Sequence, residues 1–168
     1  MALGLNVLQI VGYQNSGKTT LVTNLIRKLT EEGYKVGTIK HHGHGGKPEI
    51  SDQGKDTEQH RIAGASIVTV EGEGTISLTA DANLTLDKIL AIYELLPLDI
   101  VLVEGYKNEH YPKVVLLRNM DDLGLLSNLD NIKAIIAIEP IEQMKYPYFT
   151  RNEEAAYLHF IMNAVRGK

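Results

Sequence analysis

The sequence GYQNSGKT, from Gly12 to Thr19, limits the possible folds of this chain more than any other feature. It fits the phosphate-binding loop pattern G-x-x-x-x-G-K-[ST] at every fixed position. Gly12 and Gly17 let the backbone turn tightly and approach a phosphate, so that successive N–H groups point at the anion. Lys18 adds a charge on a mobile side chain, and the Thr19 hydroxyl can contact a magnesium ion that bridges the terminal phosphates. We therefore predict a nucleotide phosphate site at the start of a helix.

The segments on both sides of this loop agree with that prediction. Leu5 to Val11 is nearly continuous in apolar residues, as expected for a central parallel strand covered on both faces. After the loop, apolar residues recur at helical spacing as far as Leu29, and Gly33 is placed to end the helix. The apolar positions are Leu21, Val22, Leu25, Ile26 and Leu29. The pattern predicts a strand, a phosphate loop and a helix in succession.

Composition excludes several classes of function. The length of 168 residues suits a single domain spanning residues 1–168. No cysteine is present, which excludes disulfides, cysteine–zinc sites, thiolate catalysis and iron–sulfur clusters. The net charge is −4 and the basic residues are dispersed, which argues against a nucleic-acid partner. No apolar run reaches the roughly 18 residues of a membrane span. We expect a cytoplasmic protein without a membrane partner.

The rest of the chain alternates between strand and helix patterns, interrupted by one hairpin. Together these elements predict an α/β domain of the P-loop NTPase class, with a mainly parallel sheet, flanking helices and a β-hairpin extension. Asp56 is expected to cap the second helix and Thr150 with Glu153 to form a capping box for the last one. The expected elements are strands at Tyr34–Lys40, Ile67–Glu71, Thr75–Thr79, Lys113–Leu117 and Ile132–Ile138, and helices at Thr57–Ala63, from Leu86 to a stop at Pro97, and after Glu153.

The longest loop of the chain follows Lys40 and is rich in histidine. It holds His41, His42 and His44, and loops after strands are where function concentrates in open α/β sheets. The histidines could bind zinc or nickel, but their spacing is not a firm metal signature. A loop that faces phosphate or substrate is the other interpretation.

A second informative site is the sequence DIVLVEG, in which an apolar strand ends at Glu104. In a nucleotide-binding fold the carboxylate on the magnesium side belongs at the carboxyl end of such a strand. We therefore predict that Thr19, Glu104 and Asp56 hold magnesium and that Lys18 and Glu104 are the catalytic residues. If Glu104 is a structural residue at the strand end, the ligand is expected at Asp52 or Asp56. The chain has no N-K-x-D motif, so the motifs alone do not distinguish guanine from adenine.

The segments GYQNSGKTT, TIKHHGHG, GKDTEQHRIAGA and VLVEGYK, in this order, resemble those of the MobB family, molybdopterin-guanine dinucleotide biosynthesis protein B. The resemblance extends over essentially the whole chain. The most family-specific parts are the histidine loop leading to Gly54–Thr57 and the strand end from Glu104 to Lys107. The histidine run looks shorter here than in relatives that carry an unbroken histidine cluster.

This resemblance implies a GTP-binding protein with weak GTPase activity that assists a guanylyltransferase, MobA, in attaching GMP to molybdopterin. It also implies a homodimer, with GTP and Mg²⁺ as cofactors. Lys40 and Asp56 would flank the nucleotide, Glu104 would lie on magnesium, and Tyr106 and Lys107 have no assigned role. The phosphates would be held by residues from Gly12 to Thr20, among them Asn15, Ser16, Gly17, Lys18, Thr19 and Thr20.

Two other functions fit the same motifs. A P-loop kinase or ATP-dependent ligase of the dethiobiotin synthetase type also ends a strand in V-E-G, and a metallochaperone-like protein could use the histidine loop. Hydrolysis is expected to be slow, because neither the phosphate loop nor the loop after Lys40 holds an arginine and the next one along the chain is Arg61. The hairpin, expected at an edge of the sheet, is a candidate dimer element.

Overall fold

The computed structural model describes residues 5–43, 46, 48, 50, 52–141 and 144–166. Its strands are β1 (Asn6–Gly12), β2 (Val36–Lys40), β3 (Ile67–Gly72), β4 (Thr75–Ala80), β5 (Ile100–Glu104), β6 (Lys113–Leu117), β7 (Ile132–Ala137) and β8 (Tyr148–Thr150). Its helices are α1 (Lys18–Glu31), α2 (Asp56–Ile62), α3 (Leu86–Tyr93), α4 (Glu154–Arg166) and the 3₁₀ helix η1 (Met120–Asn128). Each predicted strand and helix is found, with ends that differ by a few residues.

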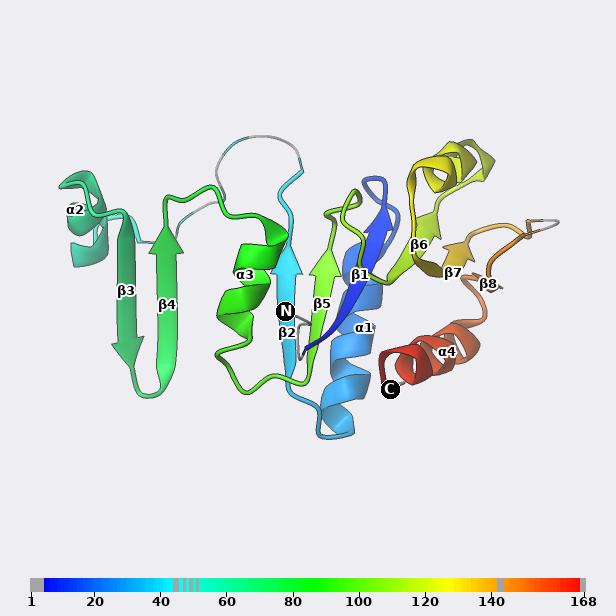
Figure 1. Ribbon diagram of the computed structural model, residues 1–168, viewed down its shortest axis with the longest axis horizontal. Coiled ribbons are helices and arrows are strands. Elements are labelled where there is room, and N and C mark those ends of the chain that lie inside the picture. Colours follow the sequence, from blue (N-terminus) through cyan, green and yellow to red (C-terminus); the bar gives the residue numbers. More distant parts are fainter. Residues whose placement is uncertain are drawn as a thin grey trace.

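The main sheet has six strands in the order β2-β5-β1-β6-β7-β8, and every neighbouring pair is parallel (Figure 1). This confirms the predicted class, an α/β domain of the P-loop type. The register pairs Glu104 on β5 with Ile10 on β1 and with Lys40 on β2. Because the strands are parallel, Lys40, Glu104 and the phosphate loop after β1 meet at one edge of the sheet.

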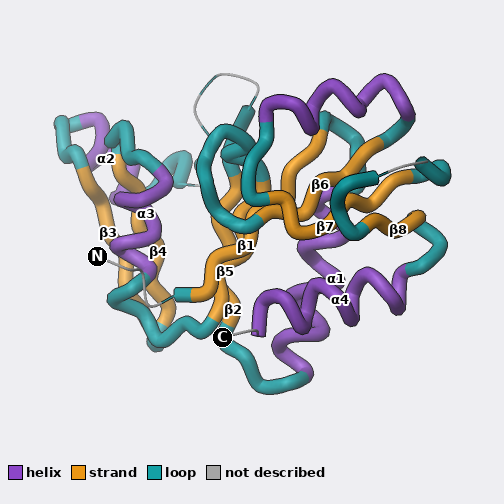
Figure 2. The backbone as a smooth tube through the Cα atoms, turned by 45° about the vertical axis from the view of Figure 1, so that its right-hand side comes forward, coloured by secondary structure: helices purple, strands orange, loops and turns teal. Residues whose placement is uncertain are grey.

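Helices cover both faces of this sheet, which explains why its central strands are mostly apolar. On one face α1 and α4 pack side by side, and α3 lies on the opposite face (Figure 2). The stripe predicted for α1 faces the sheet, with Leu25 and Leu29 fully buried. On the face of α3, the helix contributes Leu86 and Leu90, and η1 contributes Leu125 to a separate apolar cluster further along the sheet. None of the described helices is long and apolar enough to cross a membrane.

The hairpin corrects one prediction. It forms at the predicted place, but β3 and β4 make a two-stranded antiparallel sheet of their own instead of an edge of the parallel sheet. With α2, this hairpin lies at one end of the molecule, beyond α3 (Figure 1). Its strands are mostly exposed, since only Val68 among their residues is buried. The hairpin therefore gains little from the core of its own chain.

Two helix starts also differ from the prediction. Lys55 occupies the N-cap of α2, so Asp56 is the first helical residue and not the cap. The last helix begins at Glu154, and Thr150 is still part of β8. The pairing predicted for a capping box exists nonetheless, because the Glu153 carboxylate accepts hydrogen bonds from the Thr150 N–H and hydroxyl at 2.7 and 2.8 Å. It holds the turn between β8 and α4 rather than capping the helix from Thr150.

Candidate nucleotide site

The phosphate loop joins β1 to α1 and depends on two glycines, Gly12 for lack of space and Gly17 for its backbone conformation. A Cβ at Gly12 would lie 2.5 Å from Oγ of Ser16 and 2.6 Å from the carbonyl oxygen of Leu116. Gly17, the N-cap of α1, has φ = 89°, a left-handed conformation that favours glycine. Ser16 between them is fully buried. The loop therefore folds back on itself ahead of the helix, as an anion-binding turn requires.

Lys18 is the first residue of α1, and its Nζ donates a hydrogen bond to the carbonyl oxygen of Tyr13 at 2.7 Å. Burial lowers the pKa of Lys18 from its ordinary value; the negative charge of Glu104 opposes this shift, whereas Lys40 and Arg118 add to it. The negative charge of Glu104 therefore only partly offsets the effect of burial on the Lys18 ammonium. Phosphate oxygens would add further negative charge at this position.

The predicted magnesium-side residues are adjacent. The Thr19 hydroxyl lies 3.1 and 3.3 Å from the two carboxylate oxygens of Glu104, whose exposed fraction is only 9%. Nζ of Lys40 is 3.3 Å from Oε1 of the same carboxylate. A hydroxyl and a carboxylate are hard oxygen donors of the kind Mg²⁺ prefers. This pair therefore fits a magnesium ion beside the phosphates.

A pocket of about 1000 Å³ opens over these groups, lined by residues 11–20, 40–43 and 104–109. It contains nearly every residue predicted for the site, and it also includes His41 and His42. The predicted residues in its lining are Gly12, Asn15, Ser16, Gly17, Lys18, Thr19, Thr20, Lys40 and Glu104. The structure therefore gathers residues from three separate segments around one concave surface.

Asp56 does not line this pocket. It lies in the first turn of α2, and this helix lies next to the hairpin, away from the connection between β1 and α1 (Figure 1). Asp52 is held by Arg61, which donates to its two carboxylate oxygens at 2.7 and 3.0 Å. Within the described part of the chain, no group of three His, Cys, Asp or Glu residues is placed to hold a metal ion. His44 lies outside the described residues.

Two arginines that the sequence did not point to hold the phosphate loop from outside the pocket. Arg118, just after β6, donates to the carbonyl oxygen of Gln14 at 3.4 Å and forms an ion pair with the buried Asp122. Arg151, just after β8, donates to the carbonyl oxygen of Ser16 at 2.7 Å. The only signal in the sequence for either arginine is its position directly after a strand. Their charges lie near the phosphate loop, and these hydrogen bonds go to its backbone.

A parallel sheet with a phosphate loop after its central strand and a carboxylate at the end of the neighbouring strand defines a P-loop NTPase fold. The family model described as Molybdopterin guanine dinucleotide synthesis protein B, MobB, matches residues 7–138, and the chain belongs to this family. This confirms the resemblance found in the sequence. The comparisons support neither the kinase or ligase alternative nor the metallochaperone-like one.

Individual relatives agree with this assignment. A Bacillus subtilis (strain 168) protein named probable molybdopterin-guanine dinucleotide biosynthesis adapter protein is 39% identical over 165 residues, covering 96% of this chain and 94% of its own. The crystal structure of Bacillus subtilis MobB superposes with a TM-score of 0.85 at 38% identity, covering 96% of this chain and 99% of that one. The X-ray crystal structure of a MobB protein homolog from Bacillus stearothermophilus gives 0.80 at 41% identity, covering 98% and 100%.

Proposed function

We propose that this protein binds GTP with Mg²⁺ and serves as an adapter for a MobA-like guanylyltransferase that attaches GMP to molybdopterin in the cytoplasm. The observation that carries the proposal is the placement of Lys18, Thr19 and Glu104 around one pocket in a chain of the MobB family. Relatives are named adapter proteins of molybdopterin-guanine dinucleotide biosynthesis, which supports the partner and the pathway. The preference for guanine is part of the proposal and rests on that family.

Within this site each group has a separate task. The phosphate loop binds the phosphates through its N–H groups, and Lys18 neutralises charge on the β and γ oxygens. Thr19 and Glu104 are the residues that would hold magnesium, which offsets charge on the same oxygens. Lys40 forms an ion pair with Glu104 and so keeps this carboxylate at the edge of the pocket. Asp56 is not part of this arrangement, and we assign it no role in binding.

We further propose that hydrolysis by this protein alone is slow. Fast GTPases use an arginine on the transferred phosphoryl group, which adds about 10³–10⁵ in rate. Among the described residues that line the pocket there is no arginine. Arg118 and Arg151 are engaged with loop carbonyls, and Arg61 is paired with Asp52. Such a site is better suited to retaining GTP while the protein assembles with a partner than to hydrolysing GTP rapidly.

The hairpin supports a homodimer. An isolated two-stranded hairpin is at best marginally stable in water, and this one exposes Ile67, Ile76 and Leu78 at 56–64%. The register pairs Thr69 with Leu78 and Glu71 with Ile76, which places these apolar residues on one face. We propose that the same face of a second copy covers it, as an isologous contact would require.

A nucleotide-dependent pull-down tests the adapter function. The tagged protein is incubated in extract with or without GTP and with or without molybdopterin, and captured proteins are identified by mass spectrometry. Capture of the guanylyltransferase should depend on GTP and be lost in Lys18→Ala, while the exposed Lys88→Ala on α3 serves as matched control. Equal capture by parent and Lys18→Ala in every condition would contradict the proposal. Calorimetry with GTP and ATP gives the base preference, and a preference for ATP would favour a kinase or ligase instead.

A further inference from the structure

The connection between β5 and β6 is unusual for a parallel sheet. These strands lie on opposite sides of β1, so residues 105–112 must cross over β1. Parallel strands are usually joined by about a dozen residues or more, most often through a helix. This crossover is shorter and contains no helix. Its first part, residues 105–109, lines the nucleotide pocket directly after Glu104.

Gln9 lies on β1, the strand that the crossover passes over, and holds the beginning of the crossover. Its side chain is fully buried on the central strand β1, and Nε2 donates to the carbonyl oxygens of Gly105 and Tyr106 at 3.2 and 2.7 Å. Tyr106 has φ = 52°, which is uncommon for a residue with a side chain. Its ring packs against that of His41 with centroids 4.5 Å apart. Burying an amide in an otherwise apolar strand costs free energy of desolvation, which hydrogen bonds offset. Because the two hydrogen bonds of Gln9 go to Gly105 and Tyr106, we assign Gln9 a role in shaping the start of the crossover.

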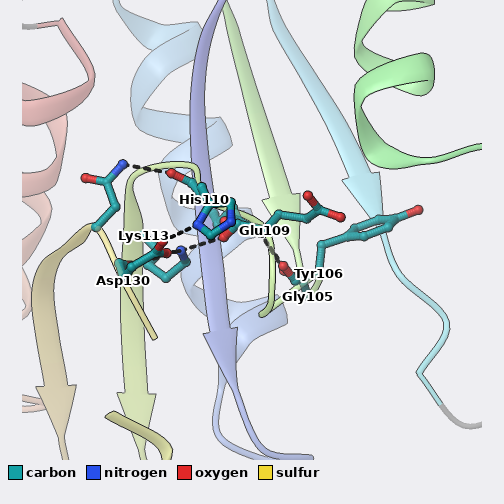
Figure 3. Close-up of polar contacts among 8 residues, drawn as sticks. Gly105, Tyr106, Glu109, His110, Lys113 and Asp130 are labelled. Carbon is teal, nitrogen blue, oxygen red and sulfur yellow. Dashed lines mark hydrogen bonds and ion pairs between the residues drawn. The ribbon is translucent and has the colours of Figure 1, made fainter. Parts of the chain in front are cut away.

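Lys113 holds the other end. It is the register partner of Gln9 on β6 and has no exposed surface. Its Nζ donates to the carbonyl oxygen of Glu109 at 2.7 Å and to Oδ1 and the carbonyl oxygen of Asp130 at 2.9 Å (Figure 3). Asn131 adds a hydrogen bond to the carbonyl oxygen of His110 at 3.0 Å. Buried side chains on adjacent strands thus fix both ends of the crossover.

Lys107 lies in the stretch that these contacts fix, and its Nζ is 5.9 Å from the centroid of the Tyr13 ring. Tyr13 belongs to the phosphate loop, and its carbonyl oxygen accepts the hydrogen bond from Lys18. Two ammonium groups therefore reach the same loop residue from different segments. An exposed cation–π contact is worth only about 0.5–1 kcal/mol, whereas a charge-assisted hydrogen bond to phosphate is stronger.

We propose that Lys107 recognises the terminal phosphate of the bound nucleoside triphosphate, and that Gln9 and Lys113 are positioning residues for it. Glu104 is a residue that would hold magnesium beside the terminal phosphates, and Lys107 follows it by three positions on a loop that lines the same pocket. A cation presented there adds to triphosphate binding and little to diphosphate binding. The inference rests on the proposed nucleotide binding and deepens it by naming what distinguishes GTP from GDP.

The test compares affinities for GDP and for a GTP analogue with a β,γ-imido bridge, both with Mg²⁺, by calorimetry. Lys107→Met should lower the affinity for the analogue about ten- to hundredfold and that for GDP less than about threefold. Lys107→Arg should recover most of the loss, and Lys88→Met on α3 should change neither affinity. Gln9→Met, which keeps the volume but removes the donor, should lower the analogue-to-GDP affinity ratio in the same direction.

The outcomes separate this inference from the proposed function. If the parent protein binds neither nucleotide, the proposed function fails and the inference fails with it. If the parent binds both and Lys107→Met leaves the ratio of the two affinities unchanged, only the inference is overturned. The Lys107→Met result tests the inference about Lys107 even if Gln9→Met fails to fold, because Lys107 is exposed and its side chain contributes nothing to the core.

Discussion

The hydroxyl of Thr19 lies 3.1 Å from Oε2 of Glu104, although the two residues are separated by 85 positions in the chain. Thr19 is the last residue of the phosphate-loop sequence and lies in the first turn of α1, whereas Glu104 ends β5. The parallel pairing of β1 with β5 brings them together. Both are oxygen donors at the edge of one pocket. The predictions about nucleotide and metal depend on this pair and on Lys18 beside it.

Replacing Glu104 by glutamine should separate binding from turnover. An uncharged amide is a poorer partner for a hydrated magnesium ion than a carboxylate. We expect nucleotide affinity to stay within about tenfold of the parent, while most magnesium-dependent hydrolysis is lost. The measurement is single-turnover GTP hydrolysis across a magnesium titration, with the exposed Glu31→Gln as control. Identical curves for Glu104→Gln and the parent would assign Glu104 a structural role at the end of β5.

Lys18→Ala should weaken triphosphate binding without unfolding the protein. The substitution removes a charge placed against the β and γ oxygens, and such contacts are worth about 1.5–3 kcal/mol, or one to two decades in affinity. The fold should survive because Lys18 contributes a single side-chain hydrogen bond, to Tyr13, among the described contacts. Calorimetric titration with GTP measures the effect, and a thermal melt checks the fold. Unchanged GTP affinity in a folded Lys18→Ala protein would show that the triphosphate is not bound at this loop in the way proposed.

Charges on the apolar face of the hairpin should dissociate the proposed dimer. Ile76→Glu and Leu78→Glu place carboxylates where two copies would meet, and burying unpaired charge is unfavourable. Thr75→Glu is the matched control, because Thr75 pairs with Gly72 and lies on the opposite face of the hairpin. Sedimentation at tens of micromolar should give a dimer for the parent and the control and a monomer for the two variants. A monomeric parent, or a dimer that tolerates both charges, would argue against this interface.

Acid should weaken the contacts that hold the crossover at residues 105–112. Hydrogen bonds from His110 and then Lys113 lower the pKa of Asp130 from 3.8 to about 2. Because the folded-state pKa is depressed, the stabilisation is complete above about pH 4 and is lost as the pH falls toward 2.

Asp130→Asn removes this titration. The urea midpoint of the parent should therefore exceed that of the variant at pH 6, and the difference should narrow between pH 4 and pH 2. The half-exposed position of Asp130 predicts a small effect that decreases with added salt. A difference that stays constant with pH would show that the Asp130 carboxylate does not stabilise the folded state.

Much of the fold follows from local pattern. The phosphate loop, the stripe of α1, the hairpin and the strand ending in Glu104 were all predictable, because each depends on periodicity or on turn residues within a short segment. The site residues from Gly12 to Thr20 follow from the same loop. Helix starts were predicted less well, because Lys55 and not Asp56 is the N-cap of α2 and Thr150 lies in β8 rather than at the start of α4.

What the sequence by itself determined is the P-loop class of the fold, the pattern of the phosphate loop and the carboxylate at the end of an apolar strand. Only the tertiary structure decided that Arg118 and Arg151 contact the phosphate loop, 104 and 135 positions from their partners, and that Asp56 lies away from it. The same holds for Gln9, whose polar side chain in an apolar strand has a purpose only once the crossover lies above it. These contacts depend on the order of strands in the sheet, and strand order is set by packing between distant segments rather than by the local periodicity that a sequence displays.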